Sequence, residues 1–356
     1  MDIVTQGLLG AVVAQSAARP SQARLAAAVG FIAGLLADAD IFIRSPDDPL
    51  LVLEYHRQFT HSLLFVPIGG LVATVLLWPF LRRRINFGQL YPLAVLGYLP
   101  SGLLDACTSY GTQLFWPVSE ARIAWNLIAV VDPLFSGVLI IALGWGLLKS
   151  TPLPARLGLG IAVLYLLVGL AQRERVENII TTFAESQGQR IERLEAKPTL
   201  GNIILWRTIY ETNGRFYVNA VRAGVFSEPR IYPGGSIEHF SPERLDGLKT
   251  GSVLAQDIDR FTDFSDGYII QYPNRPCILG DIRYAMLPTQ LIPLWGIELD
   301  LARQNQHVRF RTFRHLDETT RRAFLDMLLG RPLEQAASPS PDSNSDASAQ
   351  LRCRPD

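Results

Sequence analysis

The sequence has few charged residues and few cysteines, and each shortage excludes a class of protein. Only 19% of its 356 residues are charged, against roughly 25% in ordinary soluble proteins. Basic and acidic residues balance at 33 each without a large basic face, so nucleic-acid binding has no electrostatic support. The cysteines Cys107, Cys277 and Cys353 lie far apart and form no CxxC pair, which argues against a zinc ribbon or a disulfide scaffold.

Apolar residues fill the first half of the chain instead. The sequence is 48% hydrophobic with a mean hydropathy of +0.17, and a transmembrane helix requires about 20 mostly apolar residues. The N-terminus, MDIVTQGLLG, has an acidic residue and no basic stretch, so we expect no cleavable signal peptide. We predict an α-helical membrane domain over residues 1–172 with five or six spans: the long runs 25–43, 63–81 and 127–148, and the shorter or weaker runs 91–106, 157–171 and 3–18.

Lysine and arginine residues between these runs indicate an orientation, because they are enriched in cytoplasmic loops. With six spans, the odd-numbered connections carry more of them than the alternate connections, so we predict an external N-terminus and an external C-terminal domain. Arg173 and Arg175 weigh against this orientation, although large domains cross membranes largely regardless of charge. The odd-numbered connections contain Arg19, Arg24, Arg82, Arg83, Arg84, Lys149 and Arg156, and the others contain Arg44, Arg57 and Arg122.

The second half of the chain is typical of a soluble protein. Residues 173–335 combine strand patterns with two helical patterns, and Asn213-Gly214 is a hairpin-turn signal, so we predict a small extramembrane α+β domain. Expected strands are 190–196, 202–211, 215–223, 268–272 and 308–313, and expected helices are 242–261 and 317–329. The Ser-, Pro- and Asp-rich tail 336–356 is predicted to be disordered.

Polar residues within or beside the apolar runs are the candidates for function, because ionisable groups are costly in a membrane. In the predicted topology they lie at one face of the bilayer. Histidine nitrogen with carboxylate oxygen suits zinc, iron or manganese, and such an ion activates water for hydrolysis. The set comprises Gln6, Asp38 and Asp40 in GLLADADIF, His56 and His61 in EYHRQFTHSLLF, Asp105 and Thr108 in GLLDACTSYGT, and Asp132 in VVDPLF.

Helix geometry restricts how these residues can act together. His56 and His61 are five residues apart, about 140° from a shared face of a helix, so they could bind one ion only if they precede the helix, with Thr60 or Ser62 as N-cap. Asp38 and Asp40 alternate by two and could not both face one neighbour from a regular helix.

Each candidate also has a simpler interpretation. A histidine just outside a span is commonly an interfacial residue, and one of the two aspartates in GLLADADIF could cap a helix or face water. Asp132 precedes Pro133, which is typical of a helix N-cap. Residues 108–111 could form only a turn. Their joint placement at one face favours a site over these separate interpretations.

These residues carry a family likeness. The segments MDIVTQGLLG, GLLADADIF, HRQFTHSLLF, GLLDACTSYGTQLFWP and IAVVDPLF resemble the YdjM-like family of bacterial inner-membrane proteins, described as metal-dependent hydrolases. The likeness continues through GLAQRERVENI and KPTLGNIILWRTIYETNGRFYVNAVR to about residue 330. It implies a multi-pass protein of the bacterial inner membrane, with the C-terminal domain periplasmic in the orientation predicted above.

The resemblance also implies roles for the polar residues. His56, His61 and Asp105 would bind the ion, and Asp38 and Asp40 would be catalytic, as further ligand or general base. Two positions depart from the family, which has histidine where this chain has Gln6 and Ser101, and neither replacement is a good transition-metal ligand. The supporting residues would be Arg57, Thr60, Thr108, Tyr110, Asp132, Gln6 and Ser101.

Two classes of function therefore compete. The first is a membrane-bound metal-dependent hydrolase acting on a phosphoester or lipid headgroup at the outer leaflet. The second is a non-catalytic or metal-altered family member, in which the polar cluster is structural and the C-terminal domain binds a partner. The lipid bilayer is the expected partner in both. A transporter is disfavoured, because the polar groups gather at one face and not near the midplane.

Overall fold

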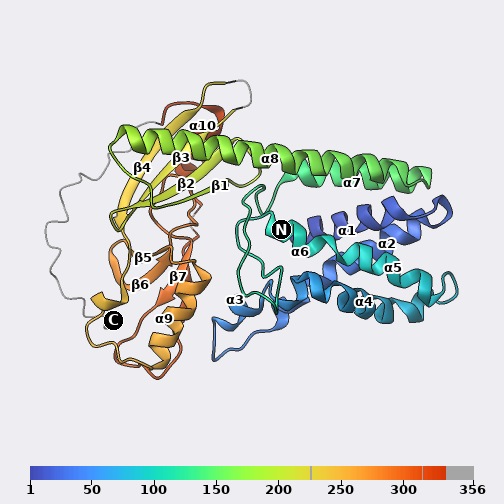
Figure 1. The fold of residues 1–356 in the computed structure, drawn as a ribbon, viewed down its shortest axis with the longest axis horizontal. Helices are drawn as coiled ribbons and strands as arrows, with labels where there is room; N and C mark the ends of the chain where they lie inside the picture. Colours follow the sequence, from blue (N-terminus) through green and yellow to red (C-terminus); the bar gives the residue numbers. More distant parts are fainter. Residues whose placement is uncertain (225–226, 315, 334–356) are drawn as a thin grey trace. The chain divides into compact units, whose positions relative to one another are not determined.

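The computed structural model describes residues 1–224, 227–314 and 316–333, which form two compact units (Figure 1). Unit 1 contains Met1–Ile43, Glu54–Glu174 and Lys197–Ile203, and unit 2 contains Arg44–Leu53, Arg175–Ala196 and the rest of the chain from Ile204. The predicted disordered tail, 336–356, lies outside the described residues.

Unit 1 is helical, and its short 3-10 helices lie where the polar residues are. Helices α1, α2, α4, α5 and α7 pack side by side in pairs (Figure 1). The α-helices are α1 (Ile3–Ala17), α2 (Ala23–Leu36), α3 (Leu51–Tyr55), α4 (Val66–Leu81), α5 (Phe87–Tyr98), α6 (Pro100–Ala106), α7 (Pro133–Lys149) and α8 (Leu153–Ser186), of which α3 begins in unit 2 and α8 continues into it. The 3-10 helices are η1 (Pro20–Gln22), η2 (Ala37–Phe42), η3 (Phe59–His61) and η4 (Leu63–Phe65).

Two predicted spans differ from the observed helices at a proline. The run 91–106 is divided between α5 and α6 at Leu99–Pro100, because proline has no N–H to donate and fits the first turn of a new helix. The run 127–148 is helical only from Pro133, where Asp132 caps α7 by accepting from the N–H groups of Leu134 and Phe135. The N-cap interpretation of Asp132 is confirmed.

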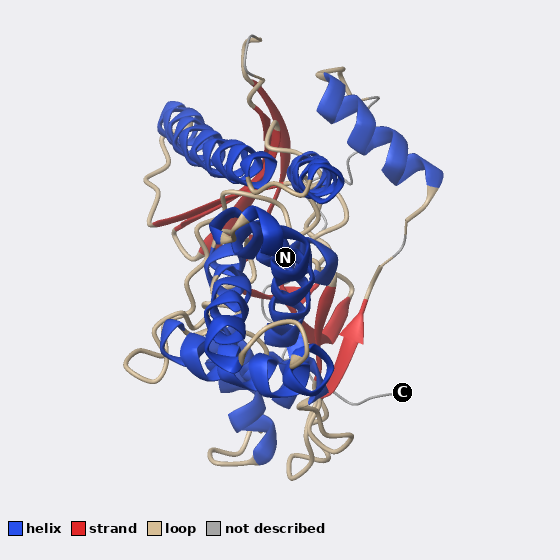
Figure 2. Ribbon diagram, turned by 90° about the vertical axis from the view of Figure 1, so that its right-hand side faces the viewer, coloured by secondary structure: helices blue, strands red, loops and turns tan. Residues whose placement is uncertain are grey.

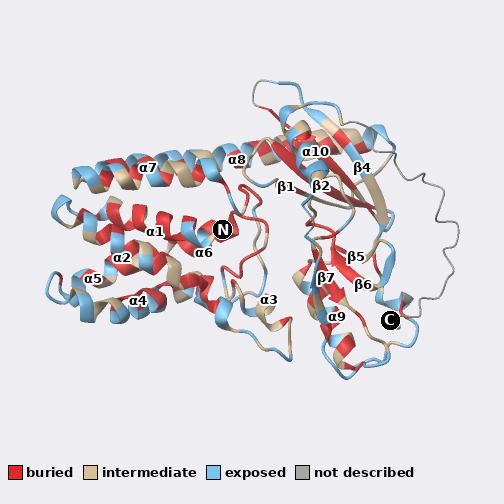
Figure 3. Ribbon diagram, turned by 180° about the vertical axis from the view of Figure 1, so that it is seen from behind, coloured by how far each residue is buried: buried red, intermediate tan, exposed pale blue. Residues whose placement is uncertain are grey.

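Three helical segments in the described part of the chain are long and apolar enough to cross a membrane: Pro20–Phe42, Leu63–Leu81 and Leu153–Ser186. The apolar helices α1 and α7 are shorter, so the count of five or six spans stays a prediction. Many residues of α4, α7 and α8 are exposed (Figure 3). Large apolar residues are among them, including Val75, Ile141 and Leu164. Because a soluble protein rarely exposes so much apolar surface, these faces are suited to lipid.

Glycines allow three helices of unit 1 to approach closely. A Cβ on Gly10 of α1 would lie 2.5 Å from the carbonyl oxygen of Gly30 in α2 and 2.6 Å from that of Gly97 in α5. Four residues farther along α2, a Cβ on Gly34 would lie 2.8 Å from the carbonyl oxygen of Gln6. Small residues permit such contacts between membrane helices. This packing places the start of α1 beside the end of α2. Asp38 and Asp40 lie in η2, which directly follows α2.

The strands form two antiparallel four-stranded sheets in the described residues (Figure 2). Ile209, Phe216 and Val218 of the first sheet pack with Tyr268 and Ile270 near the second. The first has the order β1 (Arg193–Pro198), β2 (Leu205–Thr212), β3 (Arg215–Arg222), β4 (Arg230–Glu238), and the second β5 (Ile269–Tyr272), β6 (Arg275–Asp281), β7 (Trp295–Glu298), β8 (Arg309–Thr312). The helices of this part are α9 (Val253–Phe264), α10 (Glu318–Leu329) and the 3-10 helix η5 (Pro242–Arg244).

The predicted α+β pattern is confirmed in outline. Each of the five expected strands overlaps an observed one, and Asn213-Gly214 forms the β2–β3 turn with positive φ at both residues. Strands β4, β6 and β7 were not predicted, because glycine and proline interrupt their sequences. The helix expected over 242–261 is wrong at its start, since α9 begins at Val253 after the N-cap Ser252.

A methyl group at the helix crossing tests this packing. We expect Gly10→Ala to lower the free energy of unfolding by about 1–3 kcal/mol, as overpacking does, because its Cβ would meet two backbone carbonyl oxygens. Thermal unfolding in detergent measures the effect. The control is Gly137→Ala in α7, whose Cβ would meet no described atom within 4 Å. Equal melting temperatures for the two variants would refute the close crossing.

Candidate metal centre

Four segments of unit 1 bring the polar residues together. The start of α1 supplies Gln6, η2 supplies Asp38 and Asp40, the loop before α4 supplies His56 to His61, and α6 supplies Asp105. Asp38, Asp40, His61 and Asp105 are all buried, with 8%, 2%, 1% and 0% of their surfaces exposed. Residues up to 99 positions apart in sequence thus share one enclosed polar cluster.

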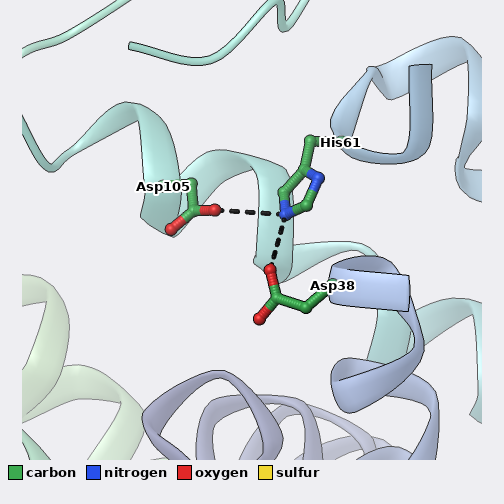
Figure 4. A group of neighbouring side chains, drawn as sticks. All are labelled: Asp38, His61 and Asp105. Atoms are coloured by element: carbon green, nitrogen blue, oxygen red, sulfur yellow. Dashed lines mark ion pairs between the residues drawn. The ribbon is translucent and has the colours of Figure 1, made fainter. Parts of the chain in front are cut away.

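His61 lies at the centre of the cluster, between two carboxylates (Figure 4). Its Nε2 atom is 3.1 Å from Oδ2 of Asp105 and 3.4 Å from Oδ1 of Asp38. Although it is buried, Nε2 has no partner with hydrogen-bond geometry among the described residues. One nitrogen therefore faces two acidic oxygens without a directed hydrogen bond to either.

The other nitrogen of His61 is held by Thr60 and Asp40. Nδ1 lies 3.0 Å from the Thr60 hydroxyl and 3.3 Å from Oδ2 of Asp40. The Thr60 hydroxyl donates to the same Asp40 oxygen over 2.6 Å. A carboxylate on the far nitrogen fixes the ring of a metal-ligating histidine and raises its basicity. Asp40 and Thr60 therefore orient Nε2 toward Asp38 and Asp105.

Backbone irregularities put these side chains in place. His56 and His61 both precede α4, and Ser62 caps η4 by accepting from the N–H of Phe65. The helix geometry that would have kept the two histidines apart therefore does not apply to them. A Cβ on Gly102 would clash with the His61 carbonyl oxygen, hence α6 can approach only through glycine. The objection to joint use of Asp38 and Asp40 holds only for a regular α-helix. Because η2 is a 3-10 helix, both carboxylates contact His61, one at each ring nitrogen.

Arg57 supplies a fixed positive charge beside Asp105. Its Nε atom is 3.1 Å from Oδ2 of Asp105, and Nη1 donates to the Thr108 hydroxyl over 3.1 Å. The guanidinium lies over the ring of Tyr110, 5.4 Å from its centroid. The backbone of Arg57 has a φ of 63° and donates its N–H to Asp40. Such a left-handed conformation costs about 1–3 kcal/mol in a residue other than glycine, and the contacts of this cluster hold it.

Gln6 points into the cluster, whereas Ser101 bonds to the backbone. The amide Nε2 of Gln6 donates to Asp105 over 3.1 Å and to Asp38 over 3.4 Å, and its Oε1 has no hydrogen-bond partner in the part of the chain that is described. The Ser101 hydroxyl donates to the carbonyl oxygen of Gly34. The α-amino group of Met1 also donates to Asp105.

His56 lies at the outer side of the cluster. Its Nδ1 is 2.8 Å from Oδ1 of Asp40, and about a third of its side chain is exposed. His56, Asp38 and Asp40 offer ligand atoms that all lie within 4.8 Å of one another, as do Asp38, His61 and Asp105. The two groups share Asp38.

Asp132 is a helix cap, and among the described residues its side chain bonds to the start of α7 and to Tyr165, not to the cluster. Besides capping α7, it accepts from the Tyr165 hydroxyl over 2.7 Å. Sequence reasoning also missed Tyr98, whose hydroxyl donates to the carbonyl oxygen of Thr60, and Gly102. A tyrosine inside an apolar run and a glycine one turn before a buried aspartate are weak signals, because both are common in membrane helices.

The inner group, Asp38, His61 and Asp105, fits a divalent ion. Ligands bonded to an ion at about 2.0–2.2 Å lie about 2.8–3.6 Å apart at octahedral or tetrahedral angles, and the two distances from His61 Nε2 are 3.1 and 3.4 Å. Burial lowers the pKa of His61, but Asp105, Asp38 and Asp40 raise it more, to about 10. The carboxylates around His61 thus favour positive charge at Nε2, which a proton or a metal ion can supply.

A third histidine–carboxylate group, in unit 2, fits an ion less well. Asp48, Asp257 and His307 offer ligand atoms within 4.8 Å of one another. However, Arg260 already contacts both carboxylates, at 2.9 Å for Asp48 and 2.8 Å for Asp257. A metal ion there would have to compete with that guanidinium, so this group is an ion-pair network holding the 44–53 segment to α9.

The carboxylates of the inner group differ in how much they stabilise the metal-free protein. We expect Asp105→Asn to cost about 3–5 kcal/mol, because it leaves the buried Arg57 without its counter-ion, whereas Asp38→Asn should cost about 1 kcal/mol, since its contacts are 3.4 Å long. Thermal unfolding with a chelator present measures both. A larger loss in Asp38→Asn would contradict this assignment of partners.

Comparison with known proteins agrees with these observations. A family model described as YdjM inner membrane protein matches residues 1–176, which carry every residue of the cluster. No curated protein and no solved structure matches the chain. Over residues 1–176, the chain belongs to the YdjM family of inner membrane proteins.

Proposed function

We propose that the protein is a membrane-bound metal-dependent hydrolase whose ion is held by Asp38, His61 and Asp105. One observation carries the proposal. The Nε2 atom of His61 faces two carboxylate oxygens in a buried site without a directed hydrogen bond, while its Nδ1 edge is held by Thr60 and Asp40. Once the proton on Nε2 is displaced, this arrangement presents a nitrogen lone pair and two oxygens to one ion.

The chain's own residues have distinct roles in this proposal. A divalent ion, when bound, supplies Lewis-acid activation of water near neutral pH. The roles implied by the resemblance change in this proposal. Asp38 is a ligand of the inner ion, Asp40 positions His61 from outside the inner group, and His56 also lies outside that group. Arg57 places a positive charge beside Asp105, where negative charge develops or binds.

An anionic phosphoester, such as a lipid headgroup, is the substrate class that suits this site. Guanidinium groups recognise phosphate well, and the cluster lies at the ends of apolar helices rather than in their middle. With residues 173–335 as an extramembrane domain on the outer side, as the distribution of lysine and arginine favours, the substrate would be reached from the outer leaflet.

A non-catalytic role is the second candidate, and one feature favours it. Gln6 and Arg57 already contact the carboxylate of Asp105, so that side chain is partly compensated without an ion. In this case the cluster would only hold the helices together. The variants Asp38→Ala and Asp105→Ala would then reduce the amount of inserted protein and would affect no activity.

Metal analysis combined with a hydrolysis assay tests the proposal. We expect the purified protein in lipid to retain a divalent ion after loading with Zn²⁺ or Mn²⁺, and to release phosphate or headgroup from vesicles containing anionic phospholipid. His61→Ala should lose the ion and at least about 100-fold in rate, since it removes a ligand. His239→Ala, which replaces a histidine beside Glu211 in unit 2, is the control.

The outcomes separate the two candidates. An ion that is lost in His61→Ala and retained in His239→Ala supports the metal site, and hydrolysis lost in parallel supports the enzyme. A well-folded protein that takes up no ion under any loading condition would sink the proposal and favour the structural role.

Gln6 provides a gain-of-function test. Replacing it with histidine puts an imidazole where an amide now contacts Asp38 and Asp105, and imidazole is a better zinc ligand than an amide. We therefore expect Gln6→His to increase Zn²⁺ affinity about tenfold or more, as measured by competition with a chromophoric chelator. Gln89→His, at an exposed position of α5, should leave the affinity unchanged. An affinity that stays constant in Gln6→His would place the ion elsewhere.

A further inference from the structure

We propose that the cluster binds two divalent ions that share Asp38. The inner ion is the one proposed above, held by Asp38, His61 and Asp105, and the inference rests on it. The outer ion is held by Asp38, Asp40 and His56. The second site makes His56 a ligand of a separate ion and gives Asp38 a bridging role.

The geometry of Asp38 carries this inference. Its Oδ1 atom faces His61, and its second oxygen is turned away from that ring (Figure 4). Both groups of possible ligands include Asp38, and within each group the ligand atoms lie within 4.8 Å of one another. A carboxylate between two such groups can give one oxygen to each ion. Two-metal enzymes hold their ions about 3.5–4 Å apart. The centroids of the His56 and His61 rings are 6.1 Å apart, so each ring can serve its own ion.

Asp40 and His56 form the rest of the outer group. His56 Nδ1 and Asp40 Oδ1 are 2.8 Å apart, within the spacing of two ligands on one ion. The other oxygen of Asp40 is engaged by the Thr60 hydroxyl and the N–H of Arg57. Asp40 therefore has one oxygen that orients His61 and another that faces the outer position.

The ion-pair network in unit 2 shows a histidine–carboxylate group that the protein's own arginine neutralises. There, one arginine contacts both carboxylates. In the outer group, Arg57 reaches Asp40 through its backbone N–H, and its guanidinium is directed to Asp105. The ring of His56, about a third exposed, shares Asp40 with His61. The outer group is thus richer in negative charge than the network that Arg260 neutralises.

Exposure distinguishes the two positions and indicates the substrate. The side chains of His61 and Asp105 are fully buried, whereas a third of His56 is exposed. A substrate would therefore approach the outer ion first. With two divalent ions and Arg57, the positive charge of the site exceeds the negative charge of the three carboxylates, so an anionic substrate is favoured. Paired ions stabilise both the attacking and the leaving oxygen of a phosphoester, which is the substrate class we assign.

Counting bound Mn²⁺ tests the inference. The full-length protein, purified in detergent and loaded with Mn²⁺, should retain two ions per chain and give the electron paramagnetic resonance spectrum of a spin-coupled pair. His56→Ala should retain one ion and lose the coupling. Because about a third of the His56 side chain is exposed, this variant should fold, and circular dichroism with thermal unfolding checks that. His239→Ala should keep two coupled ions.

The results separate this inference from the proposed function. One ion per chain in the unaltered protein, lost in His61→Ala, would overturn the second site and leave the inner site standing. Two ions without spin coupling would overturn the bridging role of Asp38. No retained ion would overturn both. Two coupled ions that persist in His56→Ala would show that His56 is not a ligand, and would overturn the outer site as assigned.

Discussion

The burial of three carboxylates among apolar helices is the constraint on which the rest of the site depends. An unpaired carboxylate in such surroundings costs several kcal/mol, so each of Asp38, Asp40 and Asp105 needs donors or a cation. Asp40 receives a backbone N–H, a hydroxyl and two imidazoles, and Asp105 receives a guanidinium, an amide and the α-amino group of the first residue. The segments that supply these donors must therefore meet, which fixes the ends of α1, α2 and α6 against the loop before α4.

Regular helices could not supply that meeting. The cluster is built where the backbone departs from the α-helix, at the 3-10 helices η2 and η3, the positive φ of Arg57 and the break at Pro100. Non-helical backbone at membrane depth is tolerated where protein covers it. Gly102 contributes to that cover, because it lets α6 approach the backbone of His61 in η3 closely.

The sequence predicted which residues would gather, but not how. Ionisable residues in apolar runs are rare enough to identify His61, Asp38 and Asp105 as partners, and the strand and turn patterns identified the α+β region. Helix periodicity does not describe the relation of Asp38 to Asp40, because it assumes 3.6 residues per turn where the chain forms a 3-10 helix. Asp38 belongs to both ligand groups because of side-chain positions that no local sequence pattern specifies.

The protein's own donors neutralise the carboxylates of the cluster unevenly, and this difference indicates where the proposed ions would bind. Asp105 has contacts of 3.1 Å with Arg57, His61 and Gln6, whereas Asp38 has contacts of 3.4 Å with Gln6 and His61. Asp38 is also the more exposed, with 10% of its side chain accessible against 0% for Asp105. The carboxylate with the weakest partners is thus the one that belongs to both ligand groups. Cations are stabilised most where negative charge is least neutralised, so the space around Asp38 is where a metal ion gains most over the protein's own donors.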